Sequence, residues 1–240
     1  KVVFSQGNLQ YQASTDTWRF AEHQYDYIGE DNENISTTYN GWIDLFGWGT
    51  GDNPTNVSTD SHDYSTFVDW GVNKISNGGN VSNAWFTLSI DEWKYLLYDR
   101  PNASAKQGVA MVNGVNGLVL LPDDWTLPDG AHFTSGFASN GDFDDYNTVN
   151  TYTISEWEVM ESAGAVFLPA AGIRYGASMS NVGTSGYYWS STYESSFYAN
   201  NVAFDSGPFN PSNNGDACYS GRSVRLCSEF VKFGTFSISN

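Results

Sequence analysis

The chain has 240 residues, of which 27 are acidic and 10 are basic, and its formal net charge is −17. This charge argues against nucleic acid and anionic membrane surfaces as partners, because phosphate binding requires clustered Lys and Arg. No apolar run approaches the roughly 18 residues that a membrane-spanning helix needs. The length suits one large domain or two small ones, and nine Trp, fifteen Tyr and fifteen Phe can fill a substantial core.

The N-terminal part of the sequence predicts short strands and long polar loops. Residues 2–12 are expected to form two strands about a turn at Gly7-Asn8. Residues 22–40 are acidic, and residues 50–63 are rich in Asn, Asp, Thr and Pro. Both stretches are typical of surface loops.

Two helices are predicted from capping boxes, in which a Ser or Thr and a Glu three residues later each satisfy a free backbone N–H of the other. One box is Ser89 with Glu92 and the other is Thr153 with Glu156, and residues 64–76 are a candidate third helix. Helical spacing directs a set of apolar side chains toward the core: Trp93, Leu96, Leu97, Trp157 and Met160.

Apolar strands follow these helices. Residues 108–112 and 117–121 are expected to form two strands joined by a short turn through Asn113-Gly114, and residues 164–169 a further strand. Gly164 is a candidate C-cap of the preceding helix. Because short strands outnumber helices, the sequence predicts an α+β fold with a mostly antiparallel sheet. No linker divides residues 1–240, so one domain is expected.

Residues 186–227 combine two strand signals with loops rich in Asn, Ser, Gly and Tyr. That composition is typical of an adaptable recognition surface, since Tyr supplies contact area and the small polar residues supply hydrogen bonds. Residues 1–185 are therefore expected to build a rigid frame on which this stretch is displayed. The core candidates are aromatic: Trp18, Phe46, Trp48, Trp93, Trp125, Trp157 and Trp189.

The sequence gives little support for catalysis or for a metal or other cofactor. His23, His62 and His132 lack metal-ligand spacing, and two cysteines, Cys218 and Cys227, make no zinc site. These cysteines either pair across adjacent strands or remain free. The sequence contains no nucleophile elbow, phosphate-binding loop or zinc-protease motif. The acidic residues at 123–124 and at 142–145 suit either a calcium site or solvated loops, and the second interpretation is preferred.

Several phrases of the sequence resemble one protein family: FSQGNLQY, WRFAEHQYDYIG, GWIDLFGWGTG, LLPDDWTLP, FLPAAGIRYG, GYYWSST and GRSVRLC. They are similar to the Fibrobacter succinogenes major paralogous domain, which is common in secreted and surface proteins of gut bacteria. The resemblance covers nearly the whole chain. It implies a C-type-lectin-like fold with two or three flanking helices, akin to formylglycine-generating enzymes and to the variable proteins of diversity-generating retroelements. It also implies a secreted or cell-surface location, although the given chain contains no export signal.

The two branches of this resemblance have different consequences. The enzymes carry an RGGSW-like segment that this chain lacks, so catalysis is not expected. Retroelements convert Asn codons to a set that excludes Lys, Gln, Glu, Met and Trp. Residues 193–220 contain one of these five types, Glu194, whereas residues 1–192 contain 28, so about four would be expected in 28 positions. This bias favours diversification, although loops rich in Asn, Ser and Gly are often poor in the same residues.

The sequence thus predicts a non-catalytic module that binds a protein or glycan at a cell surface. Strand alternation is expected to direct Asn201, Ala203 and Asp205 outward. Arg222 and Arg225 are expected to hold the closing strand in place. Arg225 is expected either to have a buried carboxylate partner or to be exposed to solvent. The predicted ligand-binding residues are Tyr193, Ser195, Ser196, Phe197, Tyr198, Asn200, Asn201, Ala203, Asp205, Phe209, Asn210, Asn213, Asn214, Asp216 and Tyr219.

Two alternatives stay open at this point. An enzyme, such as a glycosidase or a relative of the formylglycine-generating enzymes, predicts a deep pocket with perturbed carboxylates or a reactive cysteine. A purely structural surface-protein domain predicts that Tyr198 and Tyr219 are packed rather than exposed.

Overall fold

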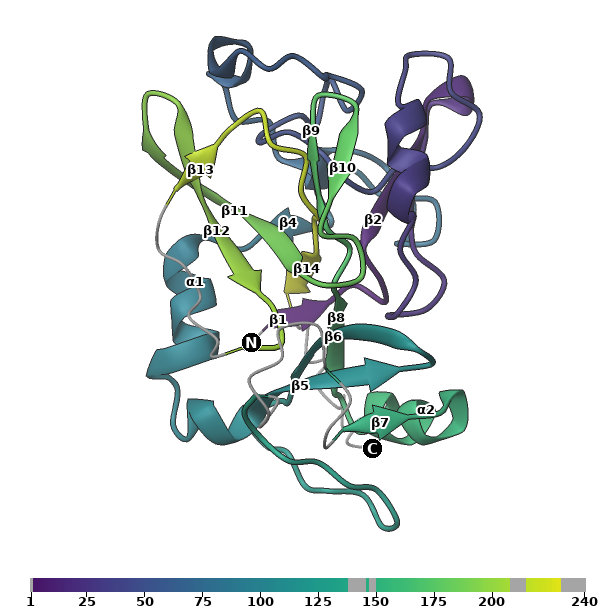
Figure 1. Ribbon diagram of the computed structural model, residues 1–240, viewed down its shortest axis with the longest axis vertical. Coiled ribbons are helices and arrows are strands. Elements are labelled where there is room, and N and C mark those ends of the chain that lie inside the picture. Colours follow the sequence, from purple (N-terminus) through teal and green to yellow (C-terminus); the bar gives the residue numbers. More distant parts are fainter. Residues whose placement is uncertain (1, 138–145, 147–149, 208–214, 230–240) are drawn as a thin grey trace, which may run out of the picture.

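The computed structural model of the protein describes residues 2–137, 146, 150–207 and 215–229. Short and mostly antiparallel strands dominate, with helices at the periphery (Figure 1). The α+β class with mostly antiparallel strands is therefore confirmed. The α-helices of the described part are α1 (Ile90–Lys94), which continues into a π-helical turn at Tyr95–Asp99, and α2 (Ile154–Ser162).

The described strands form five small sheets. One has the order β1-β14-β4, with β1 at Val2–Phe4, β14 at Leu226–Glu229 and β4 at Phe86–Thr87. The largest has the order β7-β5-β6-β8, with β7 at Thr151–Tyr152, β5 at Gln107–Val112, β6 at Val115–Leu120 and β8 at Val166–Pro169. The third has the order β11-β12-β13, with β11 at Gly186–Ser195, β12 at Tyr198–Phe204 and β13 at Asp216–Ala217. The last two pair β2 (Leu9–Gln12) with β3 (Thr17–Phe20) and β9 (Ile173–Tyr175) with β10 (Ser178–Ser180).

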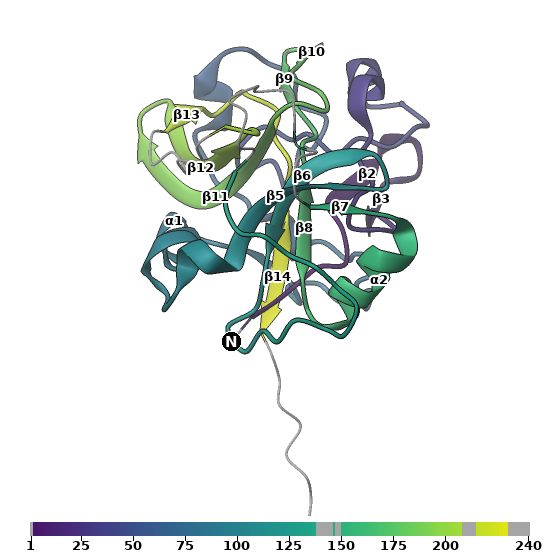
Figure 2. The same cartoon turned by 60° about the horizontal axis from the view of Figure 1, so that its bottom comes forward.

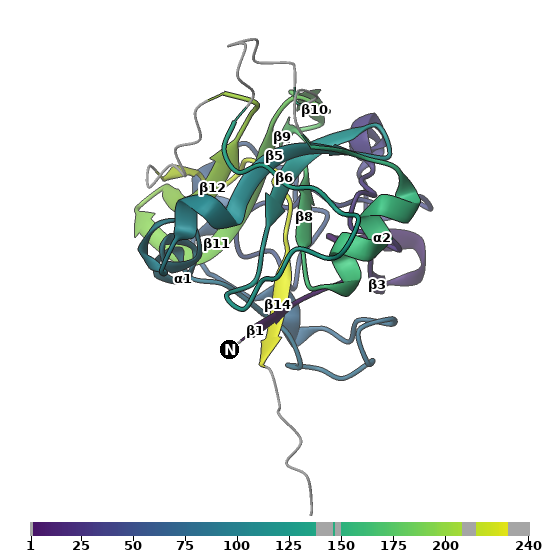
Figure 3. The ribbon, with the colours of Figure 1, turned by 90° about the horizontal axis from the view of Figure 1, so that it is seen from below.

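Local signals in the sequence are confirmed around the four-stranded sheet. Asn113 and Gly114 both have positive φ, at 50° and 78°, as a tight β5–β6 hairpin turn requires. Both predicted capping boxes are present. Trp157 and Met160 of α2 are buried, and Figure 3 shows α2 beside β8. Gly164, directly after this helix, has φ 98°, as its C-cap role requires.

A predicted turn and a predicted helix are wrong. Residues 2–12 hold two strands, but β1 pairs with β14 and β2 pairs with β3, because the chain passes from one sheet to another at Asn8. Asn8 is buried there, and its side chain contacts Tyr188 and Arg225, far along the chain. Residues 64–76 form no α-helix, since Asp60 and Asp69 cap short 3-10 turns instead.

The stretch 186–227 is part of the core rather than a segment displayed on a separate frame. Figure 2 shows the β11–β12 hairpin standing beside α1, and the backbone N–H of Ile90 donates to Thr192 Oγ1 at 3.0 Å. Most of its apolar side chains are buried: Tyr188, Trp189, Val202, Phe204, Cys218, Val224, Leu226 and Cys227. Of the seven predicted core aromatics, six are buried and Trp125 is half-buried.

Candidate functional site

The exposed end of the β11–β12 hairpin is the part of the predicted face that reaches solvent. A two-residue turn, Ser196-Phe197, joins the strands, and the register shifts between Trp189 and Tyr193 and again before Ser195. Such bulges re-aim side chains. Tyr193, Phe197 and Tyr198 are 48%, 38% and 46% exposed. Ser195 and Ser196 are exposed between them, and these five residues together with the exposed ring of His62 are called the tip surface below.

The acidic loop at residues 47–68 lies directly against this hairpin. The Trp48 ring is 5.6 Å from the Tyr193 ring, and the His62 ring is 4.7 Å from the Phe197 ring. The loop is held there by long-range backbone pairing, since the Trp48 N–H donates to the Cys218 carbonyl at 2.8 Å. The sequence places these segments about 140 residues apart, and no local motif predicts that they meet.

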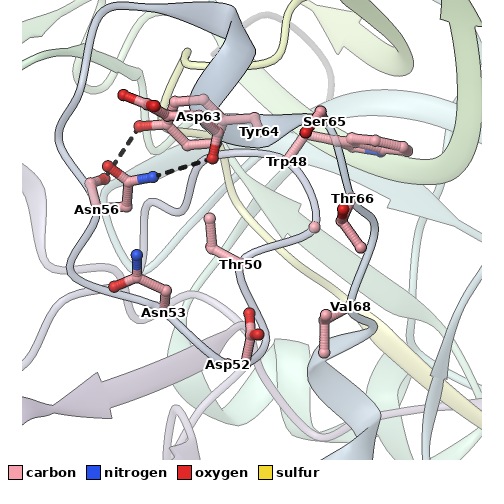
Figure 4. Close-up of a pocket in the computed structure, with 11 residues that line it drawn as sticks. Trp48, Thr50, Asp52, Asn53, Asn56, Asp63, Tyr64, Ser65, Thr66 and Val68 are labelled. Atoms are coloured by element: carbon pink, nitrogen blue, oxygen red, sulfur yellow. Dashed lines mark hydrogen bonds between the residues drawn. The ribbon is translucent and has the colours of Figure 1, made fainter.

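The same loop encloses a hollow of about 200 Å³ (Figure 4). Trp48 forms one wall and is fixed by a hydrogen bond from its Nε1 to the Ser190 carbonyl at 3.0 Å. Tyr64 is buried and donates from its hydroxyl to the Ser58 carbonyl at 2.8 Å. The other lining residues are mostly polar: Gly49, Thr50, Asp52, Asn53, Asn56, Asp63, Ser65, Thr66 and Val68.

Four side chains of the hollow have free hydrogen-bonding capacity. The Asp52 carboxylate, the Asn53 amide and the hydroxyls of Ser65 and Thr66 are exposed and make no side-chain hydrogen bond to any described residue. Asp63 accepts a bond from Ser58 Oγ at 2.5 Å, which leaves its second oxygen facing solvent. No Lys or Arg lines the hollow. The site therefore offers acceptors and negative charge to solvent, while the cation that interacts with Tyr64, Arg174, is buried.

The structure divides the predicted ligand-binding residues into four groups. Five are exposed on the tip surface: Tyr193, Ser195, Ser196, Phe197 and Tyr198. Four are half-buried: Ala203, Asp205, Asp216 and Tyr219. Asn200 and Asn201 are 8% and 2% exposed, so their assignment to the ligand face is wrong. The remaining four, Phe209, Asn210, Asn213 and Asn214, lie outside the described residues.

Asn201 is buried because both faces of β12 are covered. Val202 and Phe204 pack into one apolar cluster. On the opposite face the Arg222 guanidinium lies 4.9 Å from the Trp189 ring and donates to Asn201 Oδ1 at 2.7 Å. Simple alternation assumes one solvated face, and a long Arg side chain from a distant segment removes that face here.

Arg222 pins the closing segment, as predicted. Its guanidinium also forms an ion pair with Asp216, so this carboxylate is engaged within the fold. Burial lowers the pKa of Arg222, and the neighbouring Asp216 opposes that shift.

Arg225 is buried without a carboxylate partner. The prediction that it either pairs with a carboxylate or is exposed to solvent is therefore wrong. Its NH1 donates to Asn8 Oδ1 at 3.4 Å, while Nε and NH2 have no protein partner among the described residues. Burial lowers its pKa to about 10.

Neither the cysteines nor the described acids form a reactive cluster. Cys218 and Cys227 are free, buried and in different apolar clusters. Burial raises the pKa of Cys218 to about 12 and that of Cys227 further, the direction opposite to thiolate activation. Among the described residues no group of three or more His, Cys, Asp or Glu could hold a metal ion.

The acidic pairs considered for calcium are only partly within the described chain. Asp123 contacts Arg100 at 3.2 Å and Lys106 at 3.6 Å, so it is engaged in ion pairs. Residues 142–145 lie outside the described ranges. Burial raises the pKa of Asp44 to about 6, but this carboxyl group is enclosed and accepts hydrogen bonds from Ile28 N–H and Asn32 Nδ2.

Comparisons with protein-family models, with curated proteins and with solved structures found no match to this chain. The resemblance to the Fibrobacter succinogenes major paralogous domain therefore stays a prediction from the quoted motifs. In the described residues, no helix has the length and apolar character needed to cross a membrane.

Proposed function

We propose that the protein is a non-catalytic recognition module that binds a protein or glycan ligand at a cell surface through the tip surface. The observation that carries this proposal is the exposure of three aromatic side chains, Tyr193, Phe197 and Tyr198, on one hairpin end. Aromatic anchors supply much of the binding energy in interfaces. Their β-strand support suits a rigid presentation.

The scaffold proposed for this module is C-type-lectin-like, and the location secreted or cell-surface. Two α-helices flanking small, irregular antiparallel sheets support the first part of this proposal. The location follows from the motif resemblance alone.

Exposure separates the recognition proposal from that of a structural surface domain. A structural domain predicts packed side chains at Tyr198 and Tyr219. Tyr219 is half-buried against the core, whereas Tyr198 is 46% exposed. The tip surface, and not the whole stretch 193–220, is therefore the part that supports recognition.

Retroelement diversification belongs to the same proposal, restricted to exposed positions. Changes at residues 195–198 alter exposed side chains of the tip surface, and a change at Tyr193 alters a ring that also contacts Trp48. Changes at Asn201 would remove the acceptor of the Arg222 guanidinium. We propose that any diversified positions lie at the hairpin end, with residues 199–202 kept constant.

A binding screen with matched variants tests the proposal. Wild type, Tyr198→Ala and Tyr95→Ala would be compared on arrays of glycans and cell-surface proteins. Tyr95 is the control because it is also a tyrosine and is 49% exposed, on the turn that follows α1. We expect Tyr198→Ala to weaken binding of an array hit at least tenfold and Tyr95→Ala to leave it unchanged. Equal binding by all three folded proteins would contradict the tip surface as the site.

A further inference from the structure

We infer that the tip surface and the adjacent hollow form one docking surface for a protein segment that carries Lys or Arg side chains. This inference rests on the proposed function and names the chemistry of its ligand. The surface combines residues of two segments, 47–68 and 193–198, that lie far apart in the sequence. Three observations carry it: continuity, charge and the size of the hollow.

The two parts of the surface are physically continuous. Trp48 lines the hollow and also contacts the Tyr193 ring, at 5.6 Å. Further along the same loop, His62 contacts the Phe197 ring at 4.7 Å. A ligand that covers the Tyr193 ring therefore lies next to the hollow as well.

Charge on this surface has one sign. Asp52 and Asp63 line the hollow, Asp60 lies beside His62 at 2.7 Å, and Glu194 lies on the hairpin between two tip residues. All four are exposed. Residues 47–68 and 186–207 contain no Lys or Arg. Two arginines near this surface are buried: Arg222 is paired with an aspartate, and Arg174, which interacts with Tyr64 of the hollow, donates to the Gly176 and Leu45 carbonyls. Neither presents its charge to solvent, so the exposed charge is acidic.

Aromatic rings next to carboxylates suit a cationic side chain. A guanidinium or ammonium group is attracted to an aromatic face and makes its stronger hydrogen bonds with carboxylates. A neutral glycan would also use the rings, and its hydroxyls could donate to the carboxylates, but it would bring no charge to complement them. An acidic glycan or peptide would be repelled. Complementary charge also raises association rates, which suits a surface-displayed module.

The volume of the hollow limits what it can hold. Pockets for drug-sized ligands span about 300–1,000 Å³. At about 200 Å³ this hollow is smaller, and its volume suits one long side chain of a larger partner. The aromatic rings then contact the neighbouring residues of the same segment. The arrangement favours a peptide with a basic side chain flanked by apolar residues.

The experiment selects ligands from a random 12-residue peptide display library against the full chain. The peptides that enrich would be sequenced and synthesised, and their affinities measured for wild type and variants at two salt concentrations. The double variant Asp52→Asn/Asp63→Asn keeps the shape of the hollow and removes two charges. The control Glu33→Gln/Asp129→Asn makes the same charge change at exposed positions elsewhere. Tyr198→Ala tests the aromatic part.

We expect the enriched peptides to be several-fold richer in Lys and Arg than the input library. We expect the hollow variant to bind them at least tenfold more weakly, the control to change less than twofold, and added salt to reduce the difference. Equal losses in the hollow variant and the control would overturn the inference, because only the overall charge would then matter. A library without enriched peptides, or a dominant glycan hit on the arrays, would overturn it too.

Failure of the inference can be separated from failure of the proposed function. If Tyr198→Ala abolishes binding and the hollow variant binds normally, the recognition module stands and the cationic subsite falls. If neither change affects binding, both fall. If only the hollow variant loses binding, the joint surface is wrong and the hollow acts alone.

Discussion

Arg222 and Arg225 have opposite surroundings although both are buried three positions apart in the chain. Arg222 has Asp216, Asn201 and two aromatic rings around it, whereas Arg225 has one long hydrogen bond to Asn8. Removing Arg222 takes a donor from the buried Asn201 Oδ1, and a buried acceptor that loses its partner costs about 1–3 kcal/mol, whereas the Asp216 side chain is 41% exposed and stays solvated. Removing Arg225 takes away one long hydrogen bond and a buried charge that lacks a counter-ion.

The pair gives a matched stability test. We expect Arg222→Met to lower the free energy of unfolding by about 2 kcal/mol and Arg225→Met by clearly less, since Met fills a similar volume in both and only Arg222→Met takes a well-formed hydrogen bond from a buried acceptor. Urea unfolding followed by fluorescence measures both changes. A larger loss at Arg225 would show that Asn8 and its surroundings stabilise that guanidinium more than the contacts indicate.

Asp44 couples stability to pH. Burial raises its folded-state pKa from 3.8 to about 6, against hydrogen bonds from Asn32 and from Ile28 N–H that lower it. The neutral form is therefore favoured in the folded state, and this contribution is complete below pH 4 and lost as the pH rises through 6. The shift corresponds to about 3 kcal/mol.

Replacing the Asp44 carboxyl group with an amide isolates its contribution to the pH dependence of the unfolding free energy. We expect the unfolding free energy of wild type to fall by about 2 kcal/mol between pH 4.5 and pH 7 relative to Asp44→Asn, which does not titrate. Asp31→Asn, on the exposed side of the same loop, should keep the wild-type slope. Parallel pH profiles for wild type and Asp44→Asn would contradict the assignment.

At the scale of elements, the caps of α2 are the clearest features that sequence predicts. Thr153 accepts from Glu156 N–H through its Oγ1, and Glu156 accepts from Thr153 N–H at 2.8 Å. We expect Thr153→Ala to cost about 1 kcal/mol of unfolding free energy, the usual loss for an N-cap. Ser155 lies two residues after Thr153 and is exposed, so Ser155→Ala should be neutral or slightly stabilising, because Ala favours helices. Thermal unfolding of both variants distinguishes a cap from a general effect of Ala.

Elements with local causes were predictable, and elements with distant partners were not. A capping box and a two-residue Asn-Gly turn act within a few residues, so their sequence patterns suffice. The partner of β1 lies more than 220 residues away, at β14, and no local pattern indicates it. The same reason explains Asn201, whose burial depends on a guanidinium 21 positions later.

At the scale of the whole molecule, half of the candidate site was predictable. Composition indicated the aromatic hairpin end, because a stretch rich in Tyr and Ser and without Lys is typical of a recognition surface. The hollow was not predictable as a neighbour. Its loop has an ordinary polar composition, and its position depends on backbone pairing of Trp48 with Cys218 and of Phe46 with Arg222.

The pairing of β1 with β14 has a mechanical consequence. Val2 lies opposite Glu229, so the two ends of the described chain leave the β1–β14 ladder at the same end of its strands. Tension applied between the two ends would open this ladder one hydrogen bond after another, as in unzipping, at low force. Tension between one end and a ligand held at the hairpin would instead cross the buried clusters, which resist as a block. A module anchored by a single end would therefore hold its ligand under load better than one stretched between two anchors.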